Sequence, residues 1–288
     1  MRLVFLGTPE AAVPPLRALV DAGHDVALVV SQPDKRRGRG AALVPSPVKA
    51  AATELGLTRS DLVDDSMRVG AELGVVVAFG RLIKPHVLDA LPMVNLHFSL
   101  LPRWRGAAPV ERAILAGDAE TGVCLMGLEE GLDTGPIYES VRLSIGPEET
   151  ADELRSRLVE AGTDLLVRSL AQGLGEPVPQ VGEDTYAAKV EPGELHLDWE
   201  RPAVELHRVI RLGRAWTTFR DRRLIVARAR LRETTGGGLA PGHLDGTTVG
   251  TGDGTLELVE VQPEGKGVQD ATAWIRGARL TGGERLGG

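Results

Sequence analysis

The chain has 288 residues, 42% of them hydrophobic, and a formal net charge of −7. This length exceeds that of a typical single domain, so we expect one large domain and one small one. The chain begins on a strand-like run without signal-peptide features, and it contains no apolar stretch long enough to cross a bilayer, which predicts a soluble cytoplasmic protein. The single cysteine, Cys124, lies in an apolar run; it excludes disulfides within the chain and is expected to be a buried, inert thiol.

The first half of the chain alternates strand and helix patterns. Strands are expected at 2–7, 26–31, 73–78, 93–98 and 123–128, and helices at 13–21, 46–54 and 110–115. This alternation is typical of a parallel, doubly wound, Rossmann-like sheet. The first turn, Gly7-Thr8-Pro9-Glu10, lacks the Gly-x-Gly-x-x-Gly fingerprint, so the sheet need not bind NAD.

The second half begins with a long helix at 151–172, stopped by Gly173, and a loop marked by Pro177, Pro179, Gly182 and Thr185. A short helix from residue 203 precedes strand candidates at 217–219, 224–232, 248–251 and 255–261. Glycine clusters separate these strands, which is typical of a small β-barrel. We therefore predict a catalytic domain over 1–188, a linker over 189–203 and a C-terminal domain over 204–288.

Asn95 and His97 carry the strongest chemical signal. They lie two residues apart on the strand expected to end at residue 98, so their side chains leave the same face of the sheet. Asp133 follows later, inside Gly131-Leu132-Asp133-Thr134-Gly135. An amide can stabilise a developing oxyanion, an imidazole can carry a proton and a carboxylate can orient that imidazole, which together suit acyl transfer without a covalent intermediate. On spacing alone, a structural Asn–His pair and an ordinary turn fit the pattern too.

The segment after His97 reads Ser99-Leu100-Leu101-Pro102-Arg103-Trp104-Arg105-Gly106-Ala107-Ala108-Pro109, and its Trp and Arg favour a ligand-binding loop over a plain connector. Together with Asn95-x-His97 and Leu132-Asp133-Thr134-Gly135, it resembles the signature of the methionyl-tRNA formyltransferases, a family of folate-dependent formyltransferases. The similarity extends over nearly the whole chain, through residues 5–10, 32–34, 38–40, 45–49 and 116–122.

The resemblance implies a Rossmann-like, mostly parallel catalytic sheet followed by a small, open, OB-like β-barrel that contacts tRNA. It implies that 10-formyltetrahydrofolate donates the formyl group and that the α-amine of initiator methionyl-tRNA accepts it. Asn95 and His97 would hold the reacting oxygen, and Asp133 would orient His97 and favour its protonated form. These three residues do not make a convincing metal-ligand set, so no metal is expected. The residues expected to line the folate pocket are Phe79, Gly80, Arg81, Leu82, Ile83, Ser99, Leu100, Leu101 and Pro102.

Two basic regions are candidates for RNA contact. The segment 35–40 is glycine-rich, which predicts a mobile basic loop near the active edge, and Arg39 matches the family's tRNA-contacting arginine. The family continues with lysines after Gly40 where this chain has alanines, so its basicity is shifted. Ten arginines between 201 and 232 form the second region, which fits a phosphate footprint or a solvated arginine-rich surface equally well. The expected tRNA-binding residues are Lys35, Arg36, Arg37, Arg39, Lys49, Arg208 and Arg211.

Two other functions remain open at this stage. An enzyme that formylates an amino-sugar nucleotide would use the same amide, imidazole and carboxylate, but both basic regions favour RNA as the substrate. A non-catalytic RNA-binding module would keep the arginines without needing these three groups together. The sequence indicates neither a membrane nor an obligatory protein partner.

Overall fold

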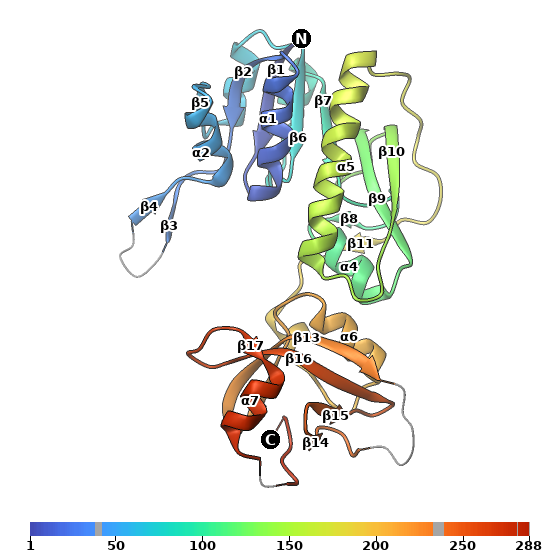
Figure 1. Cartoon of the computed structure of the whole chain (residues 1–288). Coiled ribbons are helices and arrows are strands. Elements are labelled where there is room, and N and C mark those ends of the chain that lie inside the picture. The colour runs from blue at the N-terminus through green and yellow to red at the C-terminus, as the bar shows by residue number, and fades with distance from the viewer. Residues whose placement is uncertain (38–41, 233–238, 281, 288) are drawn as a thin grey trace. The chain divides into compact units, whose positions relative to one another are not determined.

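The computed structural model describes residues 1–37, 42–232, 239–280 and 282–287, and the chain forms two compact units (Figure 1). The first unit comprises residues 1–110, 120–144 and 155–188. The second comprises residues 111–119, 145–154 and 189–288. Each unit is described by itself below. In the part of the chain that the structure describes, no helix is long and apolar enough to span a membrane.

A seven-stranded sheet forms the centre of the first unit. Its strand order is β10-β9-β7-β6-β1-β2-β5. The five strands from β7 to β5 are parallel, whereas β9 pairs antiparallel with β7 and β10 pairs antiparallel with β9. The expected mostly parallel sheet is confirmed, with two antiparallel strands at one side, as is common in large sheets of this class. The strands are β1 (Arg2–Gly7), β2 (Asp25–Val30), β5 (Arg59–Ser60), β6 (Leu73–Val77), β7 (Met93–His97), β9 (Glu120–Gly127) and β10 (Ile137–Ser144).

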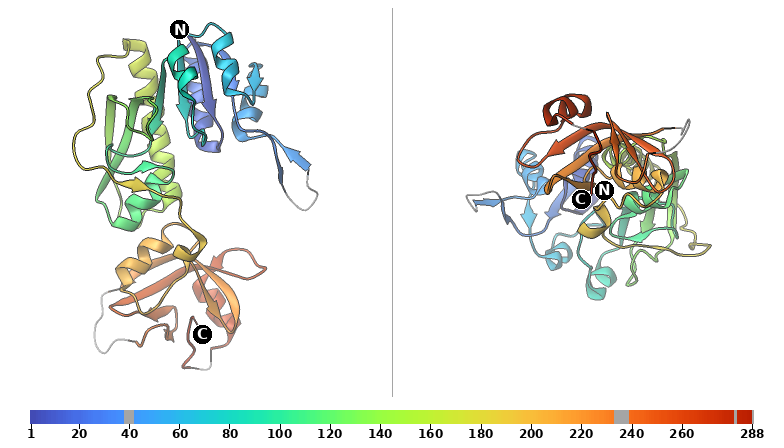
Figure 2. Two further views of the ribbon diagram at one scale, coloured as in Figure 1. Left: turned by 180° about the vertical axis from the view of Figure 1, so that it is seen from behind. Right: turned by 90° about the horizontal axis from the view of Figure 1, so that it is seen from below.

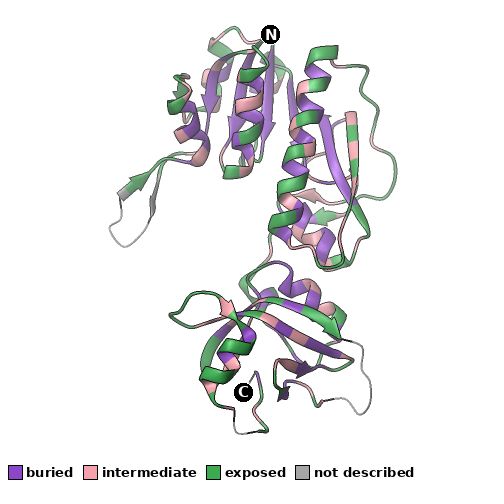
Figure 3. Cartoon of the chain, viewed as in Figure 1, coloured by how far each residue is buried: buried purple, intermediate pink, exposed green. Residues whose placement is uncertain are grey.

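Figure 3 shows the central strands buried and β10 only partly so. The sequence analysis missed β10 because an edge strand with Glu139, Ser140 and Arg142 lacks the continuous apolar run that marks its neighbours. Two short pairs flank this sheet: β3 (Lys35–Arg37) runs antiparallel to β4 (Ala42–Val44), and β8 (Arg105–Gly106) runs parallel to β11 (Tyr186–Ala187). The loop after α5 passes along β10, where Val178 bridges Ile137, before it reaches β11 (Figures 1 and 2).

Helices begin where the chain offers a cap or a proline. In α2, the side chain of Ser46 accepts a hydrogen bond from the Lys49 amide and Pro47 opens the first turn, an arrangement that satisfies the unpaired amides of a helix start. The expected bounds of α1 and α5 match the structure. The helices are α1 (Val13–Asp21), α2 (Pro47–Glu54), α3 (Pro85–Ala90), α4 (Pro109–Ala116), α5 (Ala151–Gln172), α6 (Ala203–Ile210) and α7 (Ala271–Ala278).

The second unit is built on an antiparallel sheet with the strand order β12-β13-β16-β15-β14, and β17 pairs with β16. Trp199, Leu206, Leu256 and Trp274 belong to its hydrophobic core. The register of β13 against β16 shifts on both sides of Arg228, and such bulges increase the twist that curves a small sheet around its core. The strands are β12 (Trp216–Phe219), β13 (Arg222–Arg232), β14 (Leu244–Asp245), β15 (Thr248–Gly250), β16 (Thr255–Pro263) and β17 (Gln269–Asp270).

Candidate active site

Strand β7 places Asn95 and His97 side by side on one face of the first sheet. Asn95 is 9% exposed and His97 is 5% exposed. Among the described residues, no hydrogen-bond partner is found for the Asn95 side chain. The amide is therefore available for a ligand.

His97 is held by a hydrogen bond at one ring nitrogen, and its other ring nitrogen faces a carboxylate. Nε2 lies 2.8 Å from the carbonyl oxygen of Trp104, and because a carbonyl only accepts, Nε2 carries a hydrogen and donates it. Nδ1 faces Oδ2 of Asp133 at 3.6 Å. Trp104 lies in the left-handed region at φ 63°, and its amide donates to Oγ1 of Thr185 at 2.9 Å. Nδ1 is thus the nitrogen directed toward the carboxylate.

The turn that carries Asp133 is held by close backbone contacts. Asp133 itself has φ 50°, and its Oδ2 accepts a hydrogen bond of 2.8 Å from the Gly106 amide. Gly106 has φ 113°, where a side chain would be strained and its Cβ would lie 3.1 Å from the Ala187 carbonyl oxygen. A Cβ on Gly135 would lie 1.9 Å from the Gly127 carbonyl oxygen. The Asp-Thr-Gly turn therefore tolerates no larger residue at its last position.

Gln180 completes the site and was missed by the sequence analysis. Its Nε2 donates to the carbonyl oxygens of Asp133 and Gly135, each at 2.8 Å. Its Oε1 accepts from Arg105, at 2.7 Å from Nη2 and 3.1 Å from Nε. One side chain thus ties the carboxylate turn to the loop that follows β7. No local pattern singles out this glutamine, because its partners are distant in sequence.

The expected folate-lining residues lie at the carboxyl ends of β6 and β7, which are adjacent parallel strands. Phe79 is 2% exposed and packs in the core, while its carbonyl oxygen accepts from Gln32 at 2.9 Å and Thr8 at 3.1 Å. Gly80 has φ 73°, and Leu82 is 78% exposed. Ile83 is partly buried against the same core, and Arg81 donates to the Asp61 carbonyl oxygen at 3.3 Å.

The second expected folate segment, residues 99–102, is held by its own hydrogen bonds and by packing against the core. Ser99 is fully buried and its Oγ donates to the Arg103 carbonyl oxygen at 2.6 Å, so this hydroxyl stabilises the turn. Leu101 packs with Cys124 and Met126, while Leu100 and Pro102 are partly exposed. Cys124 is buried as expected, and burial raises the pKa of its thiol to about 11, which disfavours the reactive thiolate.

Several of the expected RNA-binding cations are engaged within the protein. Lys49 is buried and pairs with Asp34 at 2.7 Å and with Asp61. Burial lowers the pKa of Lys49, but the hydrogen bonds to these two carboxylates outweigh it and hold the pKa above its ordinary value. We therefore remove Lys49 from the proposed RNA contacts. Arg39 lies outside the described residues, and for Lys35, Arg36 and Arg37 the structure describes only the backbone strand.

In the second unit, Arg211 is 8% exposed and donates to the carbonyl oxygens of Glu149 at 2.7 Å and Gly146 at 2.8 Å. It connects backbone segments, so we remove it from the RNA contacts as well. The Arg208 guanidinium lies against Gly117, where a Cβ would approach it to 2.2 Å. Other arginines of the 201–232 region pair with carboxylates, namely Arg201 with Glu205, Arg220 with Glu284, Arg222 with Glu264, Arg228 with Glu153 and Arg232 with Glu257.

No cluster of His, Cys, Asp and Glu suited to a metal ion is found within the described ranges. The site instead combines a partnerless amide, an imidazole fixed at one nitrogen and a carboxylate facing the other. Such a set can stabilise negative charge on an acyl oxygen and move a proton.

Comparisons with known proteins identify the family of the chain. The formyl transferase family matches residues 1–170, and the formyl transferase C-terminal domain matches residues 189–279. A methionyl-tRNA formyltransferase of Roseobacter denitrificans is 45% identical, with 98% of each chain covered. Two solved structures share the fold at lower identity: an N-formyltransferase from Helicobacter canadensis (TM-score 0.69, 18% identical, 91% of this chain and 98% of that one) and a methionyl-tRNA formyltransferase from Clostridium thermocellum (TM-score 0.61, 17% identical, 81% and 94%). The chain belongs to the methionyl-tRNA formyltransferase family.

Proposed function

We propose that this enzyme transfers the formyl group of 10-formyltetrahydrofolate to the α-amine of methionine carried by initiator tRNA. The observation that supports this most directly is the Asn95 amide, which is buried without a partner among the described residues, beside an imidazole that faces a carboxylate. Full-length relatives that are 45% identical act on methionyl-tRNA according to their names.

The carboxyl edge of β6 and β7 fits the folate. Gly80 brings its backbone to this edge at φ 73°, where a Cβ would meet the Gln32 amide at 3.0 Å, and the exposed Leu82 offers an apolar contact beside it. An apolar slot with a few backbone polar groups suits a flat heterocycle. Because the Phe79 carbonyl already accepts two hydrogen bonds, reading of the pterin edge falls to the backbone of 81–83 and 100–102. When bound, the folate supplies an activated formyl group.

Three side chains then act on the reacting atoms. The Asn95 amide donates to the formyl oxygen as negative charge develops there. His97 cannot accept a proton at Nε2 because that nitrogen donates to the Trp104 carbonyl, so the proton of the attacking amine passes to Nδ1, which Asp133 faces. The same proton would then pass to N10 of the folate as the bond between N10 and the formyl carbon breaks. Asp133 holds the ring in this orientation and stabilises the imidazolium.

The amino-sugar alternative rests on weaker support. The sugar N-formyltransferase from Helicobacter canadensis shares the fold at 18% identity, which says nothing of the acceptor. The 45% identity to methionyl-tRNA formyltransferases extends through the second unit. We therefore assign RNA as the acceptor and cytoplasmic translation initiation as the setting.

The test is to incubate the protein with 10-formyltetrahydrofolate and either methionyl-tRNA or an amino-sugar nucleotide. We expect N-formylmethionine to be released when the aminoacyl ester of the treated RNA is hydrolysed, and we expect no formylated sugar. Formylation of the sugar nucleotide without formylation of the RNA would reverse the assignment.

A further inference from the structure

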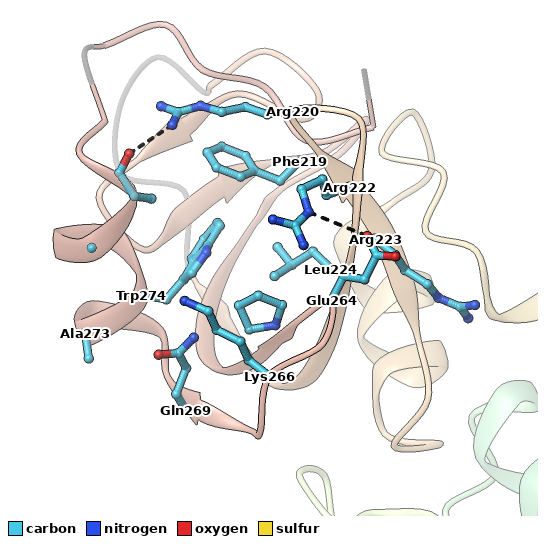
Figure 4. Close-up of a pocket in the computed structure, with 13 residues that line it drawn as sticks. Phe219, Arg220, Arg222, Arg223, Leu224, Glu264, Lys266, Gln269, Ala273 and Trp274 are labelled. Atoms are coloured by element: carbon cyan, nitrogen blue, oxygen red, sulfur yellow. Dashed lines mark hydrogen bonds and ion pairs between the residues drawn. The ribbon is translucent and has the colours of Figure 1, made fainter. Parts of the chain in front are cut away.

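The second unit contains a cavity of about 310 Å³ outside the catalytic machinery, between the β12–β13 hairpin, the β16–β17 connection and α7 (Figure 4). We call it the hairpin pocket. Its apolar wall is made by Phe219, Leu224, Pro263 and Trp274. Phe219 and Trp274 meet edge to face, with ring centroids 5.0 Å apart at 76°, which fixes the angle between two aromatic surfaces. Leu224 and Trp274 are buried, at 2% and 7% exposure, so the partly exposed Phe219 and Pro263 form the accessible part of this wall, and they suit a planar apolar group.

The rim of the hairpin pocket is strongly cationic. Four cations line it, namely Arg220, Arg222, Arg223 and Lys266, together with one carboxylate, Glu264, and Arg220 also pairs with Glu284 at 3.1 Å. Glu264 lies 3.6 Å from Arg222, an exposed pair of the kind that contributes little and exchanges readily. The Lys266 ammonium has no ion-pair partner within the described part of the chain. In a protein of net charge −7, this rim concentrates positive charge beside an apolar wall.

The two features together select the occupant. A simple anion would pair with the cations but make no contact with the aromatic wall that contributes to affinity. An apolar ligand would pack on the wall but leave the four cations without a partner on the ligand. A nucleotide needs both, because its base stacks on aromatic groups while its phosphate pairs with Arg and Lys. The only other polar side chain of the lining is Gln269, whose amide both donates and accepts and so tolerates more than one base.

We infer that the hairpin pocket binds one unpaired nucleotide of the RNA substrate. The inference rests on the proposed function for the identity of that RNA. Stacking on the wall supplies affinity without sequence readout, and the rim pairs with the flanking phosphates. A free mononucleotide also carries a base and a phosphate, so the experiment must distinguish binding of a nucleotide within the RNA from binding of a free nucleotide.

The experiment compares three variants of the full chain in binding to methionyl-tRNA at several salt concentrations. Phe219→Leu keeps an apolar side chain but loses the stacking face, and we expect its affinity to fall roughly five- to a hundredfold with an unchanged salt dependence. Lys266→Ala removes an exposed charge, and we expect the slope of log affinity against log salt to fall by about 1. Arg276→Ala is the matched control, because this exposed residue of α7 does not line the pocket and should leave base stacking intact.

A titration with adenosine monophosphate, followed by tryptophan fluorescence, forms the second arm. Quenching that disappears in Trp274→Phe and persists in Arg276→Ala would place the base at the pocket wall. Wild-type RNA affinity and salt slope in both Phe219→Leu and Lys266→Ala would overturn the inference. Loss of mononucleotide binding in these variants with unchanged RNA binding would assign the pocket to a free nucleotide and overturn it equally. Absence of formylation by the wild-type protein would instead refute the proposed function.

Discussion

The proposed catalytic edge of the first unit carries Asn95, His97 and Asp133, and the arginine-rich surface of the second unit carries the arginines between 201 and 232. The two regions differ in how their charged groups are held. At the catalytic edge, Asp133 is fixed by the Gly106 amide and by Gln180, and His97 by the Trp104 carbonyl. On the arginine-rich surface, the cations pair with carboxylates through long, exposed side chains, as in Arg228 with Glu153. The buried groups of the site are held in one geometry by their hydrogen bonds. An exposed arginine, by contrast, can leave its carboxylate partner and bind a phosphate of the RNA at little cost.

Replacing the proton-handling pair should give the largest effect. We expect His97→Ala and Asp133→Asn to reduce turnover by roughly a hundred- to ten-thousandfold, because general acid–base catalysis contributes about this much. Folate affinity should change little, since these groups act mainly in the transition state. Steady-state kinetics and folate titration provide the measurements. His86→Ala is the control, because His86 is an exposed histidine of the same unit that pairs with Asp64; comparable loss in that variant would refute the assignment.

Asn95→Ala should cause the next largest loss of turnover. Removal of one oxyanion donor typically lowers turnover by about a hundred- to a thousandfold. Because the Asn95 amide has no protein partner among the described residues, its removal should leave the melting temperature nearly unchanged. Thermal melts and single-turnover rates test both statements. A defect confined to substrate affinity would contradict the proposed role.

Gln180 tests whether the catalytic edge depends on its supporting hydrogen bonds. In Gln180→Ala, the carbonyls of Asp133 and Gly135 lose their donor, and leaving a buried group unsatisfied costs about 1–3 kcal/mol. We expect kcat to fall about tenfold or more, with KM for the RNA unchanged, because displacement of catalytic groups is costly. Gln180→Glu keeps the acceptor for Arg105 but has no donor for either carbonyl, so its kcat should fall similarly. A Glu variant with wild-type kcat would show that only the Arg105 contact matters.

The buried histidine of the second unit predicts a loss of stability in acid. His207 is 2% exposed, and burial lowers its pKa below the ordinary 6.5, although the charge of Glu148 opposes this and Arg211 reinforces it. Below pH 6.5 the unfolded chain therefore binds the proton more readily than the folded chain, and stability falls by at most about 1.4 kcal/mol per pH unit. Melting temperatures between pH 7.5 and 5 measure this.

The matched variant is His207→Gln, in which the melting temperature should fall less steeply as the pH is lowered. A residual slope is expected because burial also lowers the pKa of His24 in the first unit. An identical slope in the variant and the wild type would exclude His207 as its source.

The smallest effect should come from an exposed pair. Arg228 and Glu153 lie 2.8 Å apart with about half of each side chain exposed, and such pairs contribute about 0–1 kcal/mol. The pKa of Glu153 is held at about 2, first by the Thr150 amide, then by the Thr150 hydroxyl and only then by Arg228. Arg228→Ala should therefore leave the acid titration of Glu153 nearly unchanged, which carboxylate NMR can follow. A rise of the Glu153 pKa to its ordinary value would show that the ion pair dominates.

What the sequence predicted depends on how far apart the interacting residues lie in the chain. Asn95 and His97 could be placed because two-residue spacing on a strand fixes their common face, and α5 could be bounded because its helical period ends at Gly173. Gln180 could not be found, since its partners are 45 and 47 residues away.

The ion-pair and hydrogen-bond partners of charged side chains are likewise hard to find from the sequence when they lie far along the chain. Lys49 and Arg211 look like free cations in the sequence, but Asp61 and the backbone of Glu149 reach them only through the fold. A basic run is therefore a weaker indication of function than a local set of catalytic groups. The partners of a charged side chain must be known before it is assigned to RNA.

The segment that follows α5 determines where the catalytic unit can be divided from the rest of the chain. The three proposed catalytic residues, Asn95, His97 and Asp133, all precede Gln172, so a protein truncated there would retain all three. It would lack Gln180, Thr185 and Ala187, which accept from or donate to the backbone around Trp104, Gly106 and Asp133. Recombination between relatives should therefore exchange the unit together with residues up to 188. A hybrid joined before residue 188 would keep Asn95, His97 and Asp133 but would lose some of the hydrogen bonds that hold the backbone around them.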